Sequence, residues 1–332
     1  CPETVVEFHT YGSHIFHTSN EDVWAYINRF TDFNEYRHRV LTTARGKVYP
    51  IPVNRTTVNQ FYDMDLSSEE VADFVAAEAA KEGFSNPTNL EEKAISLIGR
   101  PLYEAFIKGY TMKQWEKDPK ELSASIINRL PVRSDDNDLY FSDAHEGIPV
   151  DGYASIFKRM LDHPLIDVQL DTDFFEVRDS LPSDAFILYT GPVDRFFDYR
   201  LGQLEWRTLD FEKQVHETSD VQSIALMNHS DPDIPYTRIH EYKHYHPERA
   251  DTGRSVTFAE YSRKAEAGDE PYYPIDTEHN RKRYAAYEQE CNALRNVVFG
   301  GRLGTYKYID MDDTLGLALL CWRDQVRPRL ER

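Results

Sequence analysis

The chain has 332 residues and a mass of 38.7 kDa, which is enough for two domains or for one elaborate domain. Its 38 basic and 57 acidic residues give a net charge of −19. This charge argues against non-specific binding to nucleic acid or to an anionic membrane, because phosphate groups attract basic surfaces. Hydrophobic residues make up 40% of the chain and the mean hydropathy is −0.63, as in soluble globular proteins with a sizeable core.

Cysteine usage and apolar runs indicate the compartment. Cys1, Cys291 and Cys321 form no closely spaced pair, so they predict reduced thiols and an intracellular protein. The most apolar run, around residues 315–321, is too short to cross a bilayer, and no basic-then-apolar leader opens the sequence. We therefore expect a cytoplasmic protein that does not insert into membranes.

A helix and a hairpin are predicted within the first 53 residues. Ser19 with Asp22 three residues later forms a capping-box pattern, and the apolar spacing that follows predicts a helix over residues 20–30. Residues 36–53 read as a β-hairpin that turns at residues 45–47.

Residues 60–128 carry mainly helical patterns. Apolar side chains recur at three- and four-residue spacing over residues 67–81. A second capping box at Thr88 and Glu91 opens another helix, which ends at Gly99, and Pro101 suits the first turn of a third helix that reaches Tyr110. This stretch therefore predicts a helical domain.

The remaining chain mixes strands and helices. Residues 134–138 are polar and predict an exposed, mobile loop, whereas residues 236–246 alternate like a two-faced antiparallel strand. Further strands are expected at residues 168–170, 185–190, 255–261 and 297–300, and further helices at residues 278–295 and from about residue 312. The interleaved order indicates a mixed α/β fold with discontinuous domains.

Known fingerprints do not explain the chemistry. The nearest approach to a dinucleotide-binding Gly-x-Gly-x-x-Gly is Gly300-Gly301-x-x-Gly304, which has the wrong spacing, and no phosphate-binding P-loop or hydrolase Gly-x-Ser-x-Gly elbow occurs. His240, His244 and His246 share one face of the expected strand, but nothing completes a zinc site. Structural or solvent-facing histidines and no metal site are expected.

Several arginines stand beside aromatic residues or prolines. Arginine forks suit phosphate oxygens, so in an acidic protein this pattern favours a site for a phosphorylated, ring-bearing ligand. The alternative is pairing with some of the 57 acidic residues. The arginines in question are Arg129, Arg133, Arg207, Arg238, Arg263 and Arg302.

The frames around these arginines resemble the bacterial UDP-galactopyranose mutase family over essentially the whole chain. The frames are Tyr11-Gly-Ser-His-Ile-Phe-His-Thr18, Ile107-Lys-Gly-Tyr-Thr-Met-Lys-Gln-Trp115, Tyr189-Thr-Gly-Pro192, Pro235-Tyr-Thr-Arg-Ile239, Gly268-Asp-Glu-Pro-Tyr-Tyr-Pro274, Gly300-Gly-Arg-Leu303 and Tyr306-Lys-Tyr308. They occur in the order and spacing of the family.

The resemblance implies an isomerase that interconverts UDP-galactopyranose and UDP-galactofuranose through a flavin N5–sugar adduct on reduced FAD. It implies an incomplete Rossmann-like FAD-binding domain with a helical bundle and an antiparallel sheet. These would be an FAD-binding α/β domain at residues 1–30, 147–195 and 275–332, a helical domain at 60–128, and a substrate domain at 31–59, 129–146 and 196–274.

Residue roles are also implied by the resemblance. Arg129 and Arg238 match two arginines that grip the diphosphate, and His14 lies beside the flavin ring. Side chains expected to bind the substrate are Phe106, Tyr110, Thr111, Trp115, Tyr140, Arg207, Asn228, Tyr273 and Tyr308. Those expected to bind the cofactor are His14, Gly301, Arg302, Tyr308 and Asp310. A break at Gly109 would let Tyr110 and Trp115 both reach the base.

The sequence departs from the family at its start. The strand, Gly-x-Gly-x-x-Gly turn and helix that hold the FAD pyrophosphate are missing, a unit of about 40 residues. The resemblance also implies a homodimer that acts in cell-wall or surface-polysaccharide biosynthesis. Two alternatives stay open: a mutase acting on UDP-N-acetylgalactopyranose, and a catalytically incompetent fragment that binds UDP-sugars.

Overall fold

A computed structural model describes residues 1–127, 132–249 and 251–331. The chain divides into two compact units, and both contain helices and strands, as the predicted mixed α/β class requires. Unit 1 comprises Cys1–Ile15, Tyr36–Ser142 and Glu205–Thr277, and unit 2 comprises Phe16–Glu35, Asp143–Leu204 and Glu278–Arg332. The division into three functional domains stays a prediction.

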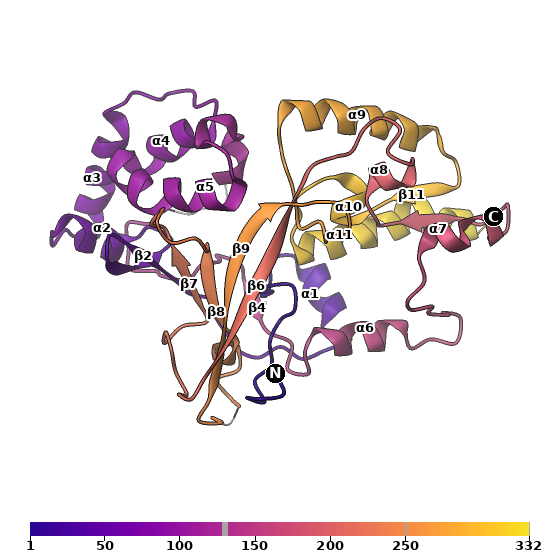
Figure 1. The fold of residues 1–332 in the computed structure, drawn as a ribbon, viewed down its shortest axis with the longest axis horizontal. Coiled ribbons are helices and arrows are strands. Elements are labelled where there is room, and N and C mark those ends of the chain that lie inside the picture. The colour runs from indigo at the N-terminus through magenta and orange to yellow at the C-terminus, as the bar shows by residue number, and fades with distance from the viewer. Residues whose placement is uncertain (128–131, 250, 332) are drawn as a thin grey trace. The chain divides into compact units, whose positions relative to one another are not determined.

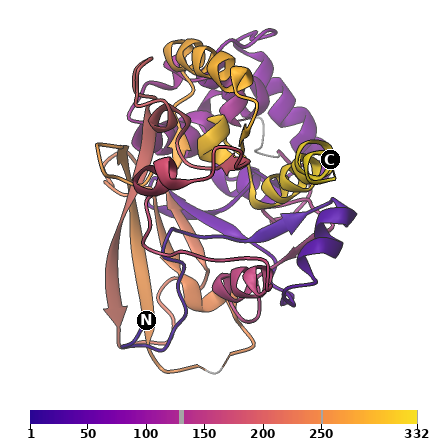
Figure 2. The same cartoon turned by 90° about the vertical axis from the view of Figure 1, so that its right-hand side faces the viewer.

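Unit 1 is built on a seven-stranded sheet with the order β10-β6-β9-β8-β7-β2-β3. Neighbouring strands are antiparallel except for the parallel pair β2 and β7. The long strands β6 and β9 run side by side in Figure 2. The strands are β2 (Val40–Ala44), β3 (Lys47–Ile51), β6 (Trp206–His216), β7 (Leu226–His229), β8 (Arg238–Glu241), β9 (Ser255–Lys264) and β10 (Tyr273–Pro274).

The sheet confirms some predicted strands and corrects another. β2 and β3 form the predicted hairpin, and Arg45 and Gly46 both have positive φ at its turn, as a tight two-residue turn requires. The strand expected over residues 236–246 was wrong beyond Glu241, because the chain turns into the 3₁₀ helix η5 (Tyr242–Tyr245). The alternating residue pattern continues beyond Glu241, but no described strand pairs with this part of the chain, so it forms no β-ladder.

Five consecutive helical segments of unit 1 gather in Figure 1 beside β2 and β3. They are α2 (Arg55–Tyr62), α3 (Ser68–Ala80), α4 (Leu90–Leu102), the π-helix η1 (Tyr103–Lys108) and α5 (Gly109–Trp115), and two 3₁₀ turns follow, η2 (Pro119–Glu121) and η3 (Ala124–Ile127). The predicted capping box at Thr88 and Glu91 was displaced by one residue. Asn89 is the N-cap of α4, and its side chain accepts from the backbone N–H of Glu92.

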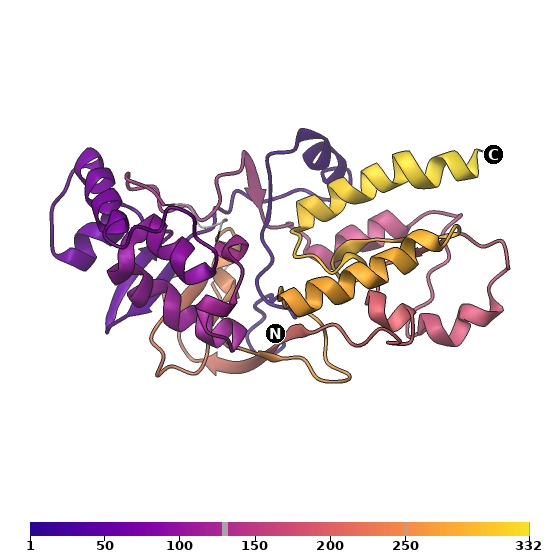
Figure 3. The same ribbon diagram turned by 90° about the horizontal axis from the view of Figure 1, so that it is seen from above.

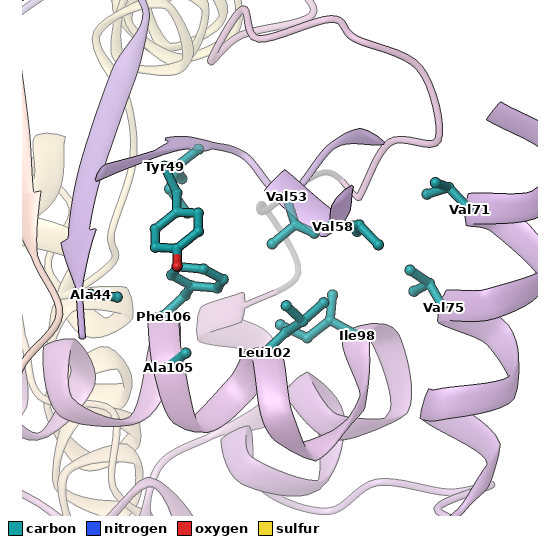
Figure 4. Close-up of a cluster of buried hydrophobic side chains, with 11 residues drawn as sticks. Ala44, Tyr49, Val53, Val58, Val71, Val75, Ile98, Leu102, Ala105 and Phe106 are labelled. Atoms are coloured by element: carbon teal, nitrogen blue, oxygen red, sulfur yellow. The ribbon is translucent and has the colours of Figure 1, made fainter. Parts of the chain in front are cut away.

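An apolar core joins these helices to the hairpin. In Figure 4, side chains from β3, α2, α3, α4 and η1 point toward one another, with the ring of Phe106 below that of Tyr49. Burial of such side chains contributes roughly 1.5–3 kcal/mol each. Gly99 interrupts α4 with φ 75°, and a Cβ there would stand 2.8 Å from the Cβ of Glu78. This glycine therefore produces the predicted break and lets α4 approach α3.

Unit 2 contains two short sheets. β1 (Phe16–Thr18) and β4 (His145–Gly147) are antiparallel, whereas β5 (Ile187–Tyr189) and β11 (Val297–Phe299) are parallel. The strand expected at residues 168–170 was wrong, because those residues lie outside any strand. Parallel pairs usually belong to α/β arrangements in which helices cover the sheet.

The helices of unit 2 include the three that the sequence predicts. They are α1 (Glu21–Ile27), α6 (Tyr153–Leu161), α7 (Phe174–Val177), η4 (Arg178–Ser180), α8 (Val193–Phe196), α9 (Glu278–Ala293), α10 (Gly301–Thr305), α11 (Met311–Cys321), the π-helix η6 (Trp322–Val326) and α12 (Arg327–Leu330). Figure 3 shows α11, η6 and α12 as one continuous rod. The N-cap of α1 is Asn20, not the predicted Ser19. In the part of the chain that the structure describes, no helix is long and apolar enough to span a membrane.

Candidate functional site

The register of the unit 1 sheet places three polar side chains in a row. Asn228 on β7 is opposite Arg238 on β8, and Arg238 is opposite Glu260 on β9. Directly opposed residues point to the same face of a sheet, about 5 Å apart at their Cβ atoms. The row continues to Thr42 on β2 and Phe211 on β6. Residues far apart in the sequence therefore meet on one face.

Arg238 is the central charge of this row. Its side chain is 23% exposed, its Nε lies 3.3 Å from Oε1 of Glu260, and its Nη2 donates to the hydroxyl of Tyr110. The guanidinium carbon stands 5.6 Å from the centre of the Tyr110 ring. Burial opposes the charge of Arg238, but Glu260 outweighs that cost and raises the pKa above its ordinary value. Tyr140 and Tyr273 also lie within electrostatic reach.

A chain of buried hydrogen bonds continues behind Glu260. The Oε2 atom of Glu260 is 2.9 Å from Nε2 of His240, and Nδ1 of His240 is 2.5 Å from the hydroxyl of Ser13. The hydroxyl of Tyr245 donates to Ser13 Oγ at 2.5 Å. One proton arrangement satisfies the whole chain: His240 donates from Nε2 and accepts at Nδ1 from Ser13. Glu260 and His240 then keep Arg238 in one place.

The pKa shifts agree with that proton arrangement. Burial lowers the pKa of His240 and favours its neutral form. Burial opposes ionisation of Glu260, but the Arg238 charge and the His240 hydrogen bond outweigh it and hold the pKa of Glu260 below its ordinary value. A carboxylate beside a neutral imidazole therefore supports the arginine.

Gly12 lies over the same row with φ 91°. A Cβ at Gly12 would stand 3.3 Å from the ring of Phe211 and 3.8 Å from Glu260 Oε2. His14 donates from Nδ1 to the carbonyl of Gly12 at 2.8 Å, and its backbone N–H donates to Nδ1 of His9 at 3.1 Å. The backbone at Gly12 thus orients the His14 ring.

The expectation that His240, His244 and His246 share one face of a strand was wrong, because β8 ends at Glu241 and the three side chains have different partners. His240 bonds Glu260, while His244 lies 3.2 Å from Glu241 and His246 lies 2.8 Å from Glu248. Asp220, Glu241 and His244 have ligand atoms within 4.8 Å of one another. However, Glu241 already accepts hydrogen bonds from the backbone of residues 221 and 222 and from a serine hydroxyl, which makes this group an ion pair of the fold.

The helix α5 carries Tyr110, Thr111 and Trp115, which the resemblance assigns to the nucleotide, and it continues directly from the π-helix η1. The expected interruption at Gly109 was wrong, because Gly109 has helical φ and ψ and the helix continues to Trp115. The glycine is needed for a different reason: a Cβ there would stand 2.2 Å from the carbonyl oxygen of Ser230. Thr111 is buried, and Tyr110, which bonds Arg238, is half-buried.

Phe106 and Trp115 pack into apolar clusters. Phe106 is buried beside Tyr49 and Phe61, with ring centres 5.0 and 5.4 Å away. Trp115 packs against the cluster that contains Tyr103. Asn228 differs, because its Oδ1 atom is buried and has no hydrogen-bond partner in the described part of the chain. An orphaned acceptor of this kind indicates a place for a donor from a ligand.

Arg207 is held by the protein itself. Its side chain is 1% exposed, and its Nε donates to the carbonyl of Gln114 at 3.0 Å and to Ser262 Oγ at 3.2 Å. Its Nη1 donates to Glu116 Oε2 at 2.5 Å. These contacts tie β6 to α5 and β9, and the substrate-binding role that the resemblance implies for Arg207 stays a prediction.

The predicted cofactor residues of unit 2 gather after β11. Gly301 follows the strand with φ 70°, and a Cβ at Gly300 would meet nothing within 4 Å. Nη2 of Arg302 donates to the carbonyl of Ile309 at 2.8 Å, and its guanidinium carbon stands 4.6 Å from the centre of the Tyr308 ring. Asp310 is the N-cap of α11. Ligands of open α/β sheets bind at the carboxyl ends of parallel strands, where this segment lies.

The sequence analysis missed some residues of the candidate site, and one that it named lies outside the described residues. Arg129 lies outside the described residues. Glu260, Ser13 and Tyr245 were not singled out from the sequence, and His240 was expected to be structural or solvent-facing. A sequence signal exists only for His240, which follows Arg238 by two positions on a strand and therefore shares its face.

Comparisons with known proteins agree with the resemblance. A family model described as UDP-galactopyranose mutase matches residues 105–308. A probable UDP-galactopyranose mutase of Klebsiella pneumoniae is 42% identical over 319 residues, which cover 96% of this chain and 82% of that protein. A dTDP-fucopyranose mutase of Escherichia coli is 39% identical over 323 residues, which cover 96% of this chain and 85% of that protein.

Solved structures show the same fold at low sequence identity. The crystal structure of a reduced UDP-galactopyranose mutase superimposes with a TM-score of 0.59 at 12% identity, over 96% of this chain and 85% of that one. A putative protoporphyrinogen oxidase from Exiguobacterium superimposes with a TM-score of 0.57 at 13% identity, over 96% of this chain and 89% of that one.

Proposed function

Because the chain belongs to the UDP-galactopyranose mutase family and is therefore an isomerase of that family, we propose that it interconverts UDP-galactopyranose and UDP-galactofuranose. The observation that carries this proposal is the row of Asn228, Arg238 and Glu260 on one face of the sheet. An arginine fork between an orphaned amide acceptor and a buried carboxylate suits a ligand with a diphosphate and a base.

Arg238 would bind the diphosphate as it becomes the leaving group. The Nε and Nη2 atoms face Glu260 and Tyr110, and Nη1 donates no hydrogen bond to any described residue. Charge-assisted hydrogen bonds to a phosphoryl group strengthen as negative charge develops on it. Because Glu260 holds the guanidinium in place, the protein need not reorganise during the reaction. Arg129 would supply the second cation, as the family resemblance implies.

Asn228 would bind the base. Its orphaned Oδ1 suits the N3–H of uracil, the donor on that ring. We place Tyr110, Thr111, Trp115 and Phe106 around the nucleoside, and Tyr140 and Tyr273 around the phosphates or the sugar. The assignment of Tyr308 to the substrate rests on the resemblance alone. Arg207 would act indirectly, because its N–H groups hold α5 at Gln114 and Glu116.

A flavin is the cofactor that the family supports, and we propose reduced FAD. When bound, it would supply the nucleophile for the anomeric carbon of the sugar. The segment after β11 fits such a group, because Gly300 leaves open space where a side chain would stand and Gly301 turns the chain with positive φ. Arg302 and Asp310 would hold the cofactor, and the assignment of His14 to the flavin ring rests on the resemblance alone.

A second candidate substrate is dTDP-fucopyranose. The 39% identity with a dTDP-fucopyranose mutase over 96% of this chain favours it. Uracil and thymine share the N3–H donor that Asn228 would accept, so that contact does not separate the two bases. Other statements stay predictions from the sequence. They are that UDP-N-acetylgalactopyranose is an alternative substrate, that the protein is a cytoplasmic homodimer, and that it acts in cell-wall or surface-polysaccharide biosynthesis.

An assay of the purified full chain tests the proposal. The chain is supplied with FAD and dithionite, and UDP-galactofuranose is followed by chromatography, with dTDP-fucopyranose offered in parallel. We expect the protein, freed of unbound FAD, to show a flavin absorbance band before dithionite is added, and to turn over UDP-galactopyranose at the higher kcat/KM after reduction. Preferred turnover of dTDP-fucopyranose would favour the second candidate, and binding of UDP without turnover of either sugar would contradict the isomerase.

A further inference from the structure

Lys113 on α5 donates to three backbone carbonyls of a single loop. Its Nζ atom lies 2.6 Å from the carbonyl oxygen of His229, 3.0 Å from that of Asp231 and 3.0 Å from that of Tyr236. An ammonium group has three N–H donors, so this arrangement satisfies all of them. No carboxylate among the described residues lies within ion-pair distance of Nζ, so its hydrogen-bond partners are carbonyl oxygens.

The loop that Lys113 holds connects β7 to β8. Its first flanking strand carries Asn228 and its second carries Arg238, which are paired across the two strands. The helix that carries Lys113 also carries Tyr110, to which Arg238 donates a hydrogen bond. One ammonium group therefore joins the element that bears Tyr110 to the turn between Asn228 and Arg238.

Other contacts show how tightly α5 approaches this turn. Ser230 Oγ donates to the carbonyl of Phe106 at 3.1 Å, and only a glycine fits at position 109 beside the Ser230 carbonyl. Burial lowers the pKa of Lys113 to about 8, against the opposing charge of Asp231. A partly buried ammonium without a carboxylate within ion-pair distance costs free energy, and its three carbonyl bonds offset that cost.

We propose that Lys113 is a positioning residue for the nucleotide diphosphate: by holding the β7–β8 turn against α5, it sets the spacing between Tyr110, Asn228 and Arg238. This inference rests on the proposed function, because it assigns those three residues to the nucleotide. Lys113 itself does not contact the substrate. The predicted signature is a loss of nucleotide affinity with little change in the rate of the chemical step.

The experiment compares Lys113→Met with Lys108→Met in the full chain. Lys108 is an exposed lysine of the preceding π-helix, so its variant controls for the loss of one charge. UDP affinity is measured by isothermal titration calorimetry, and kcat and KM are measured with UDP-galactopyranose. We expect Lys113→Met to raise the Kd of UDP and the KM about tenfold, with kcat within about threefold of wild type, and Lys108→Met to change neither.

A second variant separates positioning from folding. Lys113→Gln keeps two N–H donors, so we expect a UDP affinity between those of wild type and Lys113→Met. Unchanged UDP affinity in a folded Lys113→Met protein would overturn the inference, as would failure of both variants to fold, since the residue would then serve the fold. A wild-type chain that binds no UDP would instead overturn the proposed function, and the role of Lys113 with it.

Discussion

Arg207 and Arg238 lie on the same seven-stranded sheet of unit 1, and the protein surrounds them differently. Arg207 is 1% exposed, and its N–H groups bond a backbone carbonyl, a serine hydroxyl and Glu116. Arg238 is 23% exposed, and its described partners are a carboxylate and a tyrosine hydroxyl. The carboxylates differ in the opposite sense: Glu116 is 54% exposed, whereas Glu260 is 2% exposed.

The difference indicates what each arginine is for. A guanidinium whose three nitrogens all donate to protein atoms is a structural tie, because a ligand would have to displace those bonds. A guanidinium supported from behind by a buried carboxylate, with donors remaining, is arranged to receive an anion. Substitution at the two positions should therefore separate ligand binding from stability.

Arg238→Met is expected to have the largest effect, on catalysis. Removal of a charged donor from a developing diphosphate should lower kcat/KM at least about 100-fold, and the affinity for UDP should fall with it. Arg263→Met is the matched control, because Arg263 lies on β9 and pairs with Asp210 and Asp269 at the surface. A kcat/KM for Arg238→Met within tenfold of wild type would show that Arg238 does not bind the diphosphate.

Arg207→Met is expected to act on stability instead. Its loss removes the hydrogen bonds to Ser262 and Glu116 and one of the two donors to the carbonyl of Gln114. The free energy of unfolding should fall by about 3 kcal/mol, measured by urea denaturation. The KM of the protein that remains folded should stay within about threefold of wild type. A KM increase as large as that of Arg238→Met would erase the contrast between the two arginines.

Local features of the fold were predictable from the sequence. The β2–β3 hairpin is encoded by the short turn at Arg45 and Gly46, and the break in α4 by Gly99. The strand β6 was missed, because its first four residues, Trp206 to Leu209, are all buried and include an arginine. Such a run lacks the alternation that identifies a half-buried strand.

The candidate site was predictable only in part, because several of its contacts join residues that are distant in the sequence. Arg238 and Tyr110 were identified because their surrounding frames resemble a family, and the structure brings them into contact. The support from Glu260 depends on the register of β8 and β9, which the sequence between Arg238 and Glu260 does not reveal. The burial of Arg207 likewise depends on Gln114 and Ser262, which are distant in the chain.

Substitution of the carboxylate partners, Glu260 of Arg238 and Glu116 of Arg207, is expected to have the smallest effects and tests the comparison most specifically. The pKa of Glu260 is held below its ordinary value of 4.5, so its ionised form adds stability above that pH, and this stability is lost as the pH falls through the folded-state pKa. Glu260→Gln should therefore lower the free energy of unfolding by about 2 kcal/mol at pH 7 and less at pH 4. Glu116→Gln, at an exposed position, should cost about 0.5 kcal/mol. Urea denaturation of both variants between pH 3.5 and 7 measures the difference. Equal losses with no dependence on pH would mean that Glu260 supports Arg238 no more than Glu116 supports Arg207.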